Sequence, residues 1–168
     1  MGGETSFTGP HTLLVKGLTA TSEVEADKVV IAVGTRPAQP PGVATDGETV
    51  LTSDDLLQLQ ALPRTMTVVG AGVIGTEYAS MFGLLGVRVT LIDKRPILLD
   101  FVDDQIVEAL MYQMRNTGCT FRLGEDVSEL RVEGKNQAVA QLKSGKVIRS
   151  DVLLYSAGRA GATEALNL

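Results

Sequence analysis

The sequence predicts an α/β domain of three layers, with a parallel sheet, helices and a small antiparallel β-meander. Apolar runs typical of buried strands alternate with helix-length runs between residues 66 and 123. Shorter, alternating strands follow over 127–147, separated by the turns Gly134-Lys135-Asn136 and Ser144-Gly145-Lys146. A last apolar strand is expected over 151–156. Strands joined by helices favour parallel pairing, whereas short connecting turns favour the meander.

The residues before this core are predicted to form two strands and a linker. Thr12–Val15 and Lys28–Val33 have strand-like apolar runs, with polar, turn-rich sequence between them. The run Pro40-Pro41-Gly42 then interrupts regular structure and indicates a boundary.

Two helices and three strands are expected in the core. The strands are predicted over 66–69, 88–92 and 119–123, and the helices over 73–85 and from Asp103 or Asp104 to Gly118. Residues three or four apart lie on one face of a helix. The faces expected to pack on the sheet are therefore formed by Ile74, Tyr78, Met81 and Leu85 in the first helix and by Ile106, Leu110 and Met114 in the second.

The turn after the first core strand carries the main functional signal, Gly70-Ala71-Gly72-Val73-Ile74-Gly75. In a Rossmann-like domain, the first glycine allows the tight turn, the second lets the backbone approach a pyrophosphate, and the third lets helix and strand pack closely. The N–H groups at the helix start, including those of Val73 and Ile74, then face the ligand's negative charge. This context predicts a site for NAD(H) or NADP(H) rather than a purely structural turn.

Asp93 closes the next strand, 23 residues after Gly70. An acid at roughly this spacing accepts hydrogen bonds from the ribose hydroxyls of NAD. Lys94 and Arg95 follow directly. They are either an exposed charged turn or a grip on the 2′-phosphate of NADP, for which arginine is well shaped. The acid favours NAD and the cations favour NADP, so the sequence is compatible with the use of both.

Composition narrows the function classes. The 168 residues carry a net charge of −5, which disfavours a nucleic-acid partner. No apolar run approaches the roughly 20 residues of a membrane span, so we expect no membrane insertion. The single cysteine, Cys119, excludes an intrachain disulfide and suits a reducing cytoplasm, with the thiol a small buried side chain. The single histidine, His11, is expected in a loop, and we assign no catalytic residue and no metal ligand.

The order of three segments resembles the pyridine nucleotide-disulfide oxidoreductase family. These segments are Ile31-Ala32-Val33-Gly34-Thr35-Arg36-Pro37, the glycine motif, and Ala157-Gly158-Arg159. The resemblance extends from about Thr12 over nearly the whole chain. Within the family, Glu77-Tyr78-Ala79-Ser80 and Leu98-Leu99-Asp100-Phe101-Val102-Asp103 are most similar to a member that exchanges hydride between NADPH and NAD through FAD.

The resemblance implies roles for individual residues. It assigns Gly70, Gly72 and Gly75 to the pyrophosphate and Asp93 to the ribose. Glu77 matches an acid that lies near the nicotinamide and pairs with a lysine of the flavin domain; a favourable acid in the first helical turn is the alternative. The backbone around Gly158 is implied to approach the nicotinamide end, although Ala160-Gly161-Ala162 stands where the family often has proline and asparagine.

Other family features are missing from the sequence. It has neither a second glycine fingerprint for FAD nor paired redox cysteines. We therefore expect residues 1–40 to be a remnant of flavin-domain strands and linker, 41–160 the NAD(P)-binding domain, and 161–168 the start of the return to the flavin domain. FAD would belong to the parent protein, expected to be a homo-oligomer, and would not be bound by this fragment. Alone, the fragment is expected to be inactive.

Two alternatives stay open. One is the corresponding domain of a dihydrolipoamide dehydrogenase-like disulfide reductase. The other is a stand-alone module that binds or senses nicotinamide nucleotides.

Overall fold

The computed structural model describes residues 3–40 and 42–168, which divide into two compact units. One comprises the described residues up to Arg36 together with Ala160–Leu168, and the other comprises Pro37–Arg159. The two segments that join them pair as strands β4 (Thr35–Pro37) and β13 (Arg159–Gly161).

The smaller unit is built on an antiparallel sheet of three strands, β1 (Gly3–Gly9), β2 (Thr12–Gly17) and β3 (Thr21–Glu25). The short helix η2 (Glu164–Leu166) lies against β1, where the Asn167 amide donates a 2.9 Å hydrogen bond to the carbonyl oxygen of Phe7.

The strand predicted over Lys28–Val33 does not form. Its apolar side chains are exposed, Val30 to 89%. A strand needs a neighbour for its backbone N–H and C=O groups. None of the described strands pairs with this segment, although its apolar composition favours a strand.

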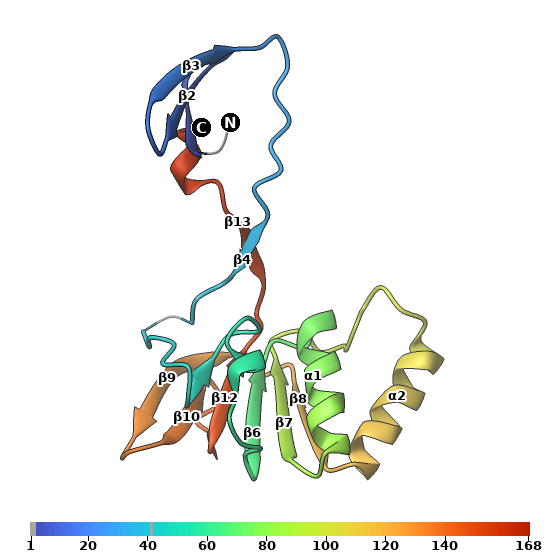
Figure 1. Ribbon diagram of the computed structural model, residues 1–168. Helices are drawn as coiled ribbons and strands as arrows, with labels where there is room; N and C mark the ends of the chain where they lie inside the picture. The colour runs from blue at the N-terminus through green and yellow to red at the C-terminus, as the bar shows by residue number, and fades with distance from the viewer. Residues whose placement is uncertain (1–2, 41) are drawn as a thin grey trace. The chain divides into compact units, whose positions relative to one another are not determined.

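The larger unit has the predicted three layers (Figure 1). Its middle layer is a parallel sheet in the order β5-β12-β6-β7-β8. The strands are β5 (Val50–Leu51), β6 (Thr65–Val69), β7 (Arg88–Asp93), β8 (Cys119–Leu123) and β12 (Val152–Tyr155). A short helix, η1 (Leu56–Gln58), precedes β6.

Helices cover one face of this sheet, and the β-meander covers the other. The helices are α1 (Val73–Leu84) and α2 (Asp104–Asn116), and the meander strands are β9 (Val127–Glu133), β10 (Gln137–Leu142) and β11 (Val147–Ser150). Alternate strand residues serve the two faces: Leu91 packs in the helix-side cluster and Ile92 in the meander-side cluster. The predicted fold class, including the meander, is confirmed.

The apolar face predicted for α1 is wrong at Met81 and Leu85, whereas Tyr78 packs against the helix-side core. The buried residues of α1 are Gly75, Thr76, Ala79, Phe82 and Gly83, whereas Met81 and Leu85 are 47% and 61% exposed. Small residues bring the helix close to its neighbours, and a Cβ added at Gly83 would lie 3.1 Å from the Thr117 hydroxyl. The α1 sequence is apolar nearly all round, so spacing alone did not identify the buried side.

The second helix follows the prediction more closely. Its N-cap is Asp103, whose carboxylate accepts a 3.0 Å hydrogen bond from the backbone N–H of Gln105. Met114 is buried and Leu110 packs against the core, but Ile106 is 62% exposed and Val107 takes its place.

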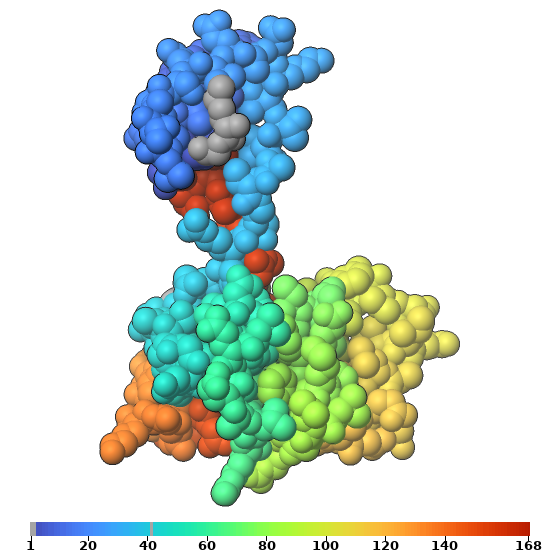
Figure 2. Space-filling model, viewed as in Figure 1, coloured from blue at the N-terminus to red at the C-terminus, as the bar shows by residue number. Residues whose placement is uncertain are grey.

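Figure 2 shows the atoms of α1 and α2, coloured green to yellow, as a continuous surface of the larger unit. None of the helices formed by residues 3–40 and 42–168 combines the length and apolarity needed to cross a bilayer.

Candidate functional site

A cleft of about 720 Å³ lies at the carboxyl ends of the parallel strands in the larger unit. β6 pairs with β7 on one side and with β12 on the other, so the strand order reverses at β6. Ligands of open α/β sheets bind outside the carboxyl ends at such a switch point. The cleft is lined by Val69, Gly70, Gly72, Val73, Ile74, Ile92, Asp93, Lys94, Arg95, Glu125, Asp126, Val127, Leu130, Tyr155, Ser156, Ala157, Gly158 and Arg159.

The three glycines of the turn have different steric surroundings. Gly70 has φ +104°, and a Cβ added there would lie 2.6 Å from the carbonyl oxygen of Ser156. A Cβ at Gly75 would overlap the carbonyl oxygen of Gly70. At Gly72, in contrast, nothing lies within 4 Å of an added Cβ. The protein itself therefore requires glycine at Gly70 and Gly75, while Gly72 keeps the cleft open above the turn.

The open space at Gly72 coincides with the start of α1. Gly72 is the N-cap residue, and its carbonyl oxygen accepts the helical hydrogen bond from the Thr76 N–H at 3.0 Å. Among residues 3–40 and 42–168, no side chain caps this end, and the first turn of α1 contains no acid. Val73 and Ile74, the first helical residues, line the cleft. A helix end without a side-chain cap, opening on a cleft, suits an anionic group.

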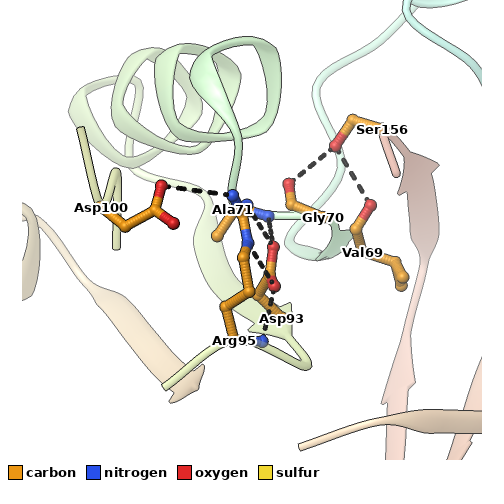
Figure 3. Close-up of polar contacts among 7 residues, drawn as sticks. All are labelled: Val69, Gly70, Ala71, Asp93, Arg95, Asp100 and Ser156. Carbon is orange, nitrogen blue, oxygen red and sulfur yellow. Dashed lines mark hydrogen bonds and ion pairs between the residues drawn. The ribbon is translucent and has the colours of Figure 1, made fainter. Parts of the chain in front are cut away.

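Asp93 is held at the base of this turn (Figure 3). It is the last residue of β7 and is 8% exposed. Its Oδ2 accepts a 2.6 Å hydrogen bond from the Ala71 N–H, and Oδ1 accepts one of 2.8 Å from the Arg95 N–H. Burial alone would raise the pKa of Asp93, but the side chain and backbone of Arg95, with the Ala71 amide, lower it below the ordinary value.

The Arg95 guanidinium makes a bidentate pair with the same carboxylate. Its Nε lies 3.0 Å from Oδ1 and its Nη2 lies 2.9 Å from Oδ2 of Asp93. Its Nη1 is 3.8 Å from the Asp100 carboxylate. Figure 3 draws this ion pair as a dashed line. Lys94 is exposed and lines the cleft beside Arg95. The structure thus brings together the predicted acid and both predicted cations.

Two further acids in the cleft wall are paired with lysines from the β10–β11 turn. The hydrogen bond from Lys146 lowers the pKa of Glu125. The hydrogen bond from Lys143 is the main cause of the lowered pKa of Asp126, and Lys94 adds a smaller Coulomb attraction. These pairs offset negative charge beside the cleft.

Gly158 and Arg159 form the part of the wall after β12. Gly158 has φ +132°, a conformation that favours glycine, and its carbonyl oxygen accepts a 3.0 Å hydrogen bond from the Ala38 N–H. The Arg159 Nη1 lies 3.3 Å from both the Asp54 carboxylate and the Ser53 hydroxyl.

Two of the residues assigned to the cofactor from the sequence do not line the cleft. Gly75 lies beneath the turn as a packing residue, and Glu77 is exposed on α1. Because α1 begins at Val73, Glu77 is its fifth residue, so the alternative of a first-turn acid is wrong. The nicotinamide-side role of Glu77 stays a prediction.

Some residues of the cleft wall were not predicted from the sequence, among them Glu125, Asp126, Val127, Leu130, Tyr155 and Ser156. The signal was available in part: Glu125 lies two residues after the predicted strand 119–123, and Ser156 is the last residue of the predicted strand 151–156. Ligand sites gather at such carboxyl ends of parallel strands. No group of three or more His, Cys, Asp or Glu side chains suited to a metal occurs in the described part of the chain.

A family model, sequence relatives and solved structures all match nearly the whole chain. The family model described as pyridine nucleotide-disulphide oxidoreductase matches residues 3–167. The chain is 49% identical over 168 residues to the soluble pyridine nucleotide transhydrogenase of Mycobacterium tuberculosis (strain ATCC 25177 / H37Ra), with 99% of this chain and 36% of that protein covered. It is 46% identical to the protein of the same name from Photobacterium profundum, with 99% and 35% covered. The chain thus spans about a third of the length of these relatives.

Solved structures show the same fold. The HOCl-induced flavoprotein disulfide reductase RclA from Escherichia coli has a TM-score of 0.82 and 30% identity, over 99% of this chain and 37% of RclA. LpdA from Mycobacterium tuberculosis has a TM-score of 0.85 and 27% identity, over 97% of this chain and 36% of LpdA. Because the family model covers nearly every residue, the chain belongs to the pyridine nucleotide-disulphide oxidoreductase family.

Proposed function

We propose that this chain is the nicotinamide-nucleotide-binding part of a flavin-dependent oxidoreductase that transfers hydride between NADPH and NAD through FAD. The observation that carries the binding role is the glycine turn: the space above Gly72 is open where α1 begins at the cleft. A cleft of about 720 Å³ lies within the range of small-ligand sites, about 300–1,000 Å³. Sequence identity of 45–49% to soluble pyridine nucleotide transhydrogenases supports the reaction.

In this proposal the chain's own residues bind and orient the nucleotide. The N–H groups at Gly72, Val73 and Ile74 receive the pyrophosphate, because they stand at the positive end of α1. Asp93, Lys94 and Arg95 face the adenosine ribose, and the backbone around Gly158 faces the nicotinamide end. FAD, bound elsewhere in the parent protein, supplies the redox chemistry when present.

The flavin domain of the parent is the proposed partner of the remaining segments. The apolar side chains of 29–33 are exposed, and exposed apolar patches mark interaction sites. We assign the segments before residue 41 and after residue 160 to the flavin-domain side, with the nucleotide domain at 41–160. We also propose that Glu77, exposed on α1, pairs with a lysine of that domain.

A disulfide reductase is the second candidate, favoured by the structural likeness to RclA. It would need a redox cysteine pair in another part of the parent, because Cys119 is the single cysteine here and is buried. The greater sequence identity to transhydrogenases favours the first candidate. We also assign the parent to the cytoplasm, and the homo-oligomeric parent stays a prediction.

Calorimetric titration with NADH and NADPH tests the binding role. We expect weak, measurable binding, because the chain would supply only its own side of the site. Absence of heat with both nucleotides, in a chain shown to be folded by circular dichroism, would contradict the proposal. A flavin-free assay with NADPH and an NAD analogue is expected to show no turnover.

A further inference from the structure

The carboxylate of Asp93 is fully engaged by the protein itself. Oδ1 accepts hydrogen bonds from the Arg95 backbone N–H and from its Nε, and Oδ2 accepts them from the Ala71 N–H and from Arg95 Nη2. An ionised carboxylate has about four lone-pair sites. All of them are therefore used, and the side chain is only 8% exposed.

This arrangement conflicts with the simple role of a ribose-binding acid. The two hydroxyls of the adenosine ribose of NAD would donate to the acid at the end of the second strand. Here they find no vacant acceptor while the guanidinium stays in place. The Ala71 and Arg95 N–H groups are both backbone donors, so no side-chain rotation can remove them from Asp93. The Arg95 guanidinium is the donor that side-chain rotation can remove, and its departure frees one site on each oxygen.

The same guanidinium keeps donors for another ligand. It has five N–H groups, of which Nε and one on Nη2 are directed at Asp93. Arg95 lines the cleft and its side chain is 39% exposed. Within the described part of the chain, its Nη1 has only the 3.8 Å contact with Asp100, a side chain that is 58% exposed. A phosphate at the ribose 2′ position would accept hydrogen bonds from the remaining N–H groups of the guanidinium. Arg95 can make them while it stays paired with Asp93.

We propose that Arg95 determines the nucleotide preference of this site by favouring NADP(H) and opposing NAD(H). Held on Asp93, it presents N–H donors to a 2′-phosphate. For a ribose with a free 2′-hydroxyl it is a competitor, which has to leave before Asp93 can accept the two hydroxyls. This inference rests on the proposed binding of nicotinamide nucleotides and adds the residue that separates the two forms.

The test is to titrate the 168-residue chain and its Arg95→Ala variant with NADH and with NADPH. Binding is measured by the fluorescence of the reduced nucleotide. Loss of a charge-assisted phosphate contact is expected to weaken NADPH binding by about tenfold or more. NADH binding is expected to strengthen at least about twofold, because Asp93 gains two acceptor sites. Unchanged or weaker NADH binding in the variant would overturn the inference.

Arg131→Ala is the matched control. Arg131 also makes an ion pair with an acid two residues away, Glu133 at 2.9 Å, and it does not line the cleft. The control removes the same charge, so it is expected to leave the ratio of the two affinities unchanged. A shift of that ratio equal to the one in Arg95→Ala would assign the effect to net charge and would overturn the inference.

Asp100→Asn gives a second, independent readout on an exposed side chain. It removes the acid beside Nη1, so NADPH binding is expected to strengthen by about twofold or more and NADH binding to stay constant. No gain in NADPH binding would contradict the placement of the 2′-phosphate at Arg95. If the unmodified, folded chain binds neither nucleotide, the proposed function fails as well. If it binds both and only the Arg95 pattern is absent, this inference alone fails.

Discussion

The hydroxyl oxygen of Ser156 lies 2.9 Å from the carbonyl oxygen of Gly70 and 3.1 Å from that of Val69. This contact joins the end of β12 to the glycine turn at the end of β6 (Figure 3). The backbone N–H of Ser156 also donates to the Val69 carbonyl at 2.8 Å. One residue after β12 therefore fixes the turn on which the nucleotide is proposed to rest.

Ser156→Ala is expected to destabilise the chain, because the part-buried carbonyl oxygen of Gly70 loses the hydroxyl donor of Ser156. The expected loss in the free energy of unfolding is about 1 kcal/mol, measured by urea denaturation. Ser128→Ala is the control: its hydroxyl donates to the Gln141 carbonyl at 3.1 Å in an exposed position, where water replaces the bond. Equal losses in the two variants would contradict a special role for Ser156.

Gly75→Ala is expected to be more damaging. Its methyl group would overlap the carbonyl oxygen of Gly70, which is backbone and cannot rotate away. The expected cost is about 1–3 kcal/mol, the range of core overpacking, with a lower thermal midpoint. A variant with the stability of the unmodified chain would show that the turn and α1 can move apart freely.

Gly72→Ala is expected to separate binding from folding. The added methyl meets nothing within 4 Å, so the free energy of unfolding should change by less than about 1 kcal/mol. Nucleotide binding is expected to fall steeply, because the methyl occupies the space proposed for the pyrophosphate. Calorimetry with NADPH measures this, and undiminished uptake by the variant would place the phosphates elsewhere.

Acid is expected to weaken the larger unit through Asp93. The folded pKa of this carboxyl lies below its ordinary value of about 3.9, so the ionised form stabilises the fold. That stability is complete above the unfolded pKa and is lost as the pH falls through the folded one. Urea unfolding between pH 6 and about pH 3 should therefore show the advantage over Asp93→Asn shrinking with acidity. A stability difference between the two proteins that stays constant from pH 6 to about pH 3 would contradict a stabilising role of the ionised Asp93.

Cys119 is expected to be an unreactive thiol in the folded chain. It is buried at the start of β8, and this burial raises its pKa to about 11. Because the thiolate is the reactive form, a thiol-specific reagent at about pH 8 should modify Cys119 only slowly until urea unfolds the protein. Rapid modification without denaturant would contradict its burial.

Local sequence rules predicted the parts of this structure that depend on local chemistry. The glycine turn and the meander follow from backbone requirements and alternation, and both are where the sequence placed them. The strand over 28–33 was wrong because a strand also requires a neighbour, which no local pattern supplies. The face of α1 was wrong at Met81 and Leu85, because the small residues Gly75 and Ala79 are the ones that pack closely on the sheet side.

The site shows the same division between local and tertiary information. Spacing placed Asp93 and Arg95 beside the cleft, but the saturation of the Asp93 carboxylate depends also on Ala71, 22 residues away. The wall residue Glu125 follows β8 and Tyr155 ends β12, and the parallel pairing of the sheet brings the carboxyl ends of these strands to the same edge. The sequence shows which residue types these are, but their proximity depends on the pairing of strands that lie far apart in the chain.

The backbone of β7 and β8 stays paired beyond the last strand residues: the Glu125 N–H donates to the Asp93 carbonyl at 3.1 Å, and the Gly124 N–H to that of Arg95 at 2.9 Å. The backbone of residues 93 to 95 is therefore held in place by hydrogen bonds to the segment after β8. These main-chain bonds do not depend on the side chains of Lys94 and Arg95, so substitutions at these two positions can alter coenzyme preference without breaking them.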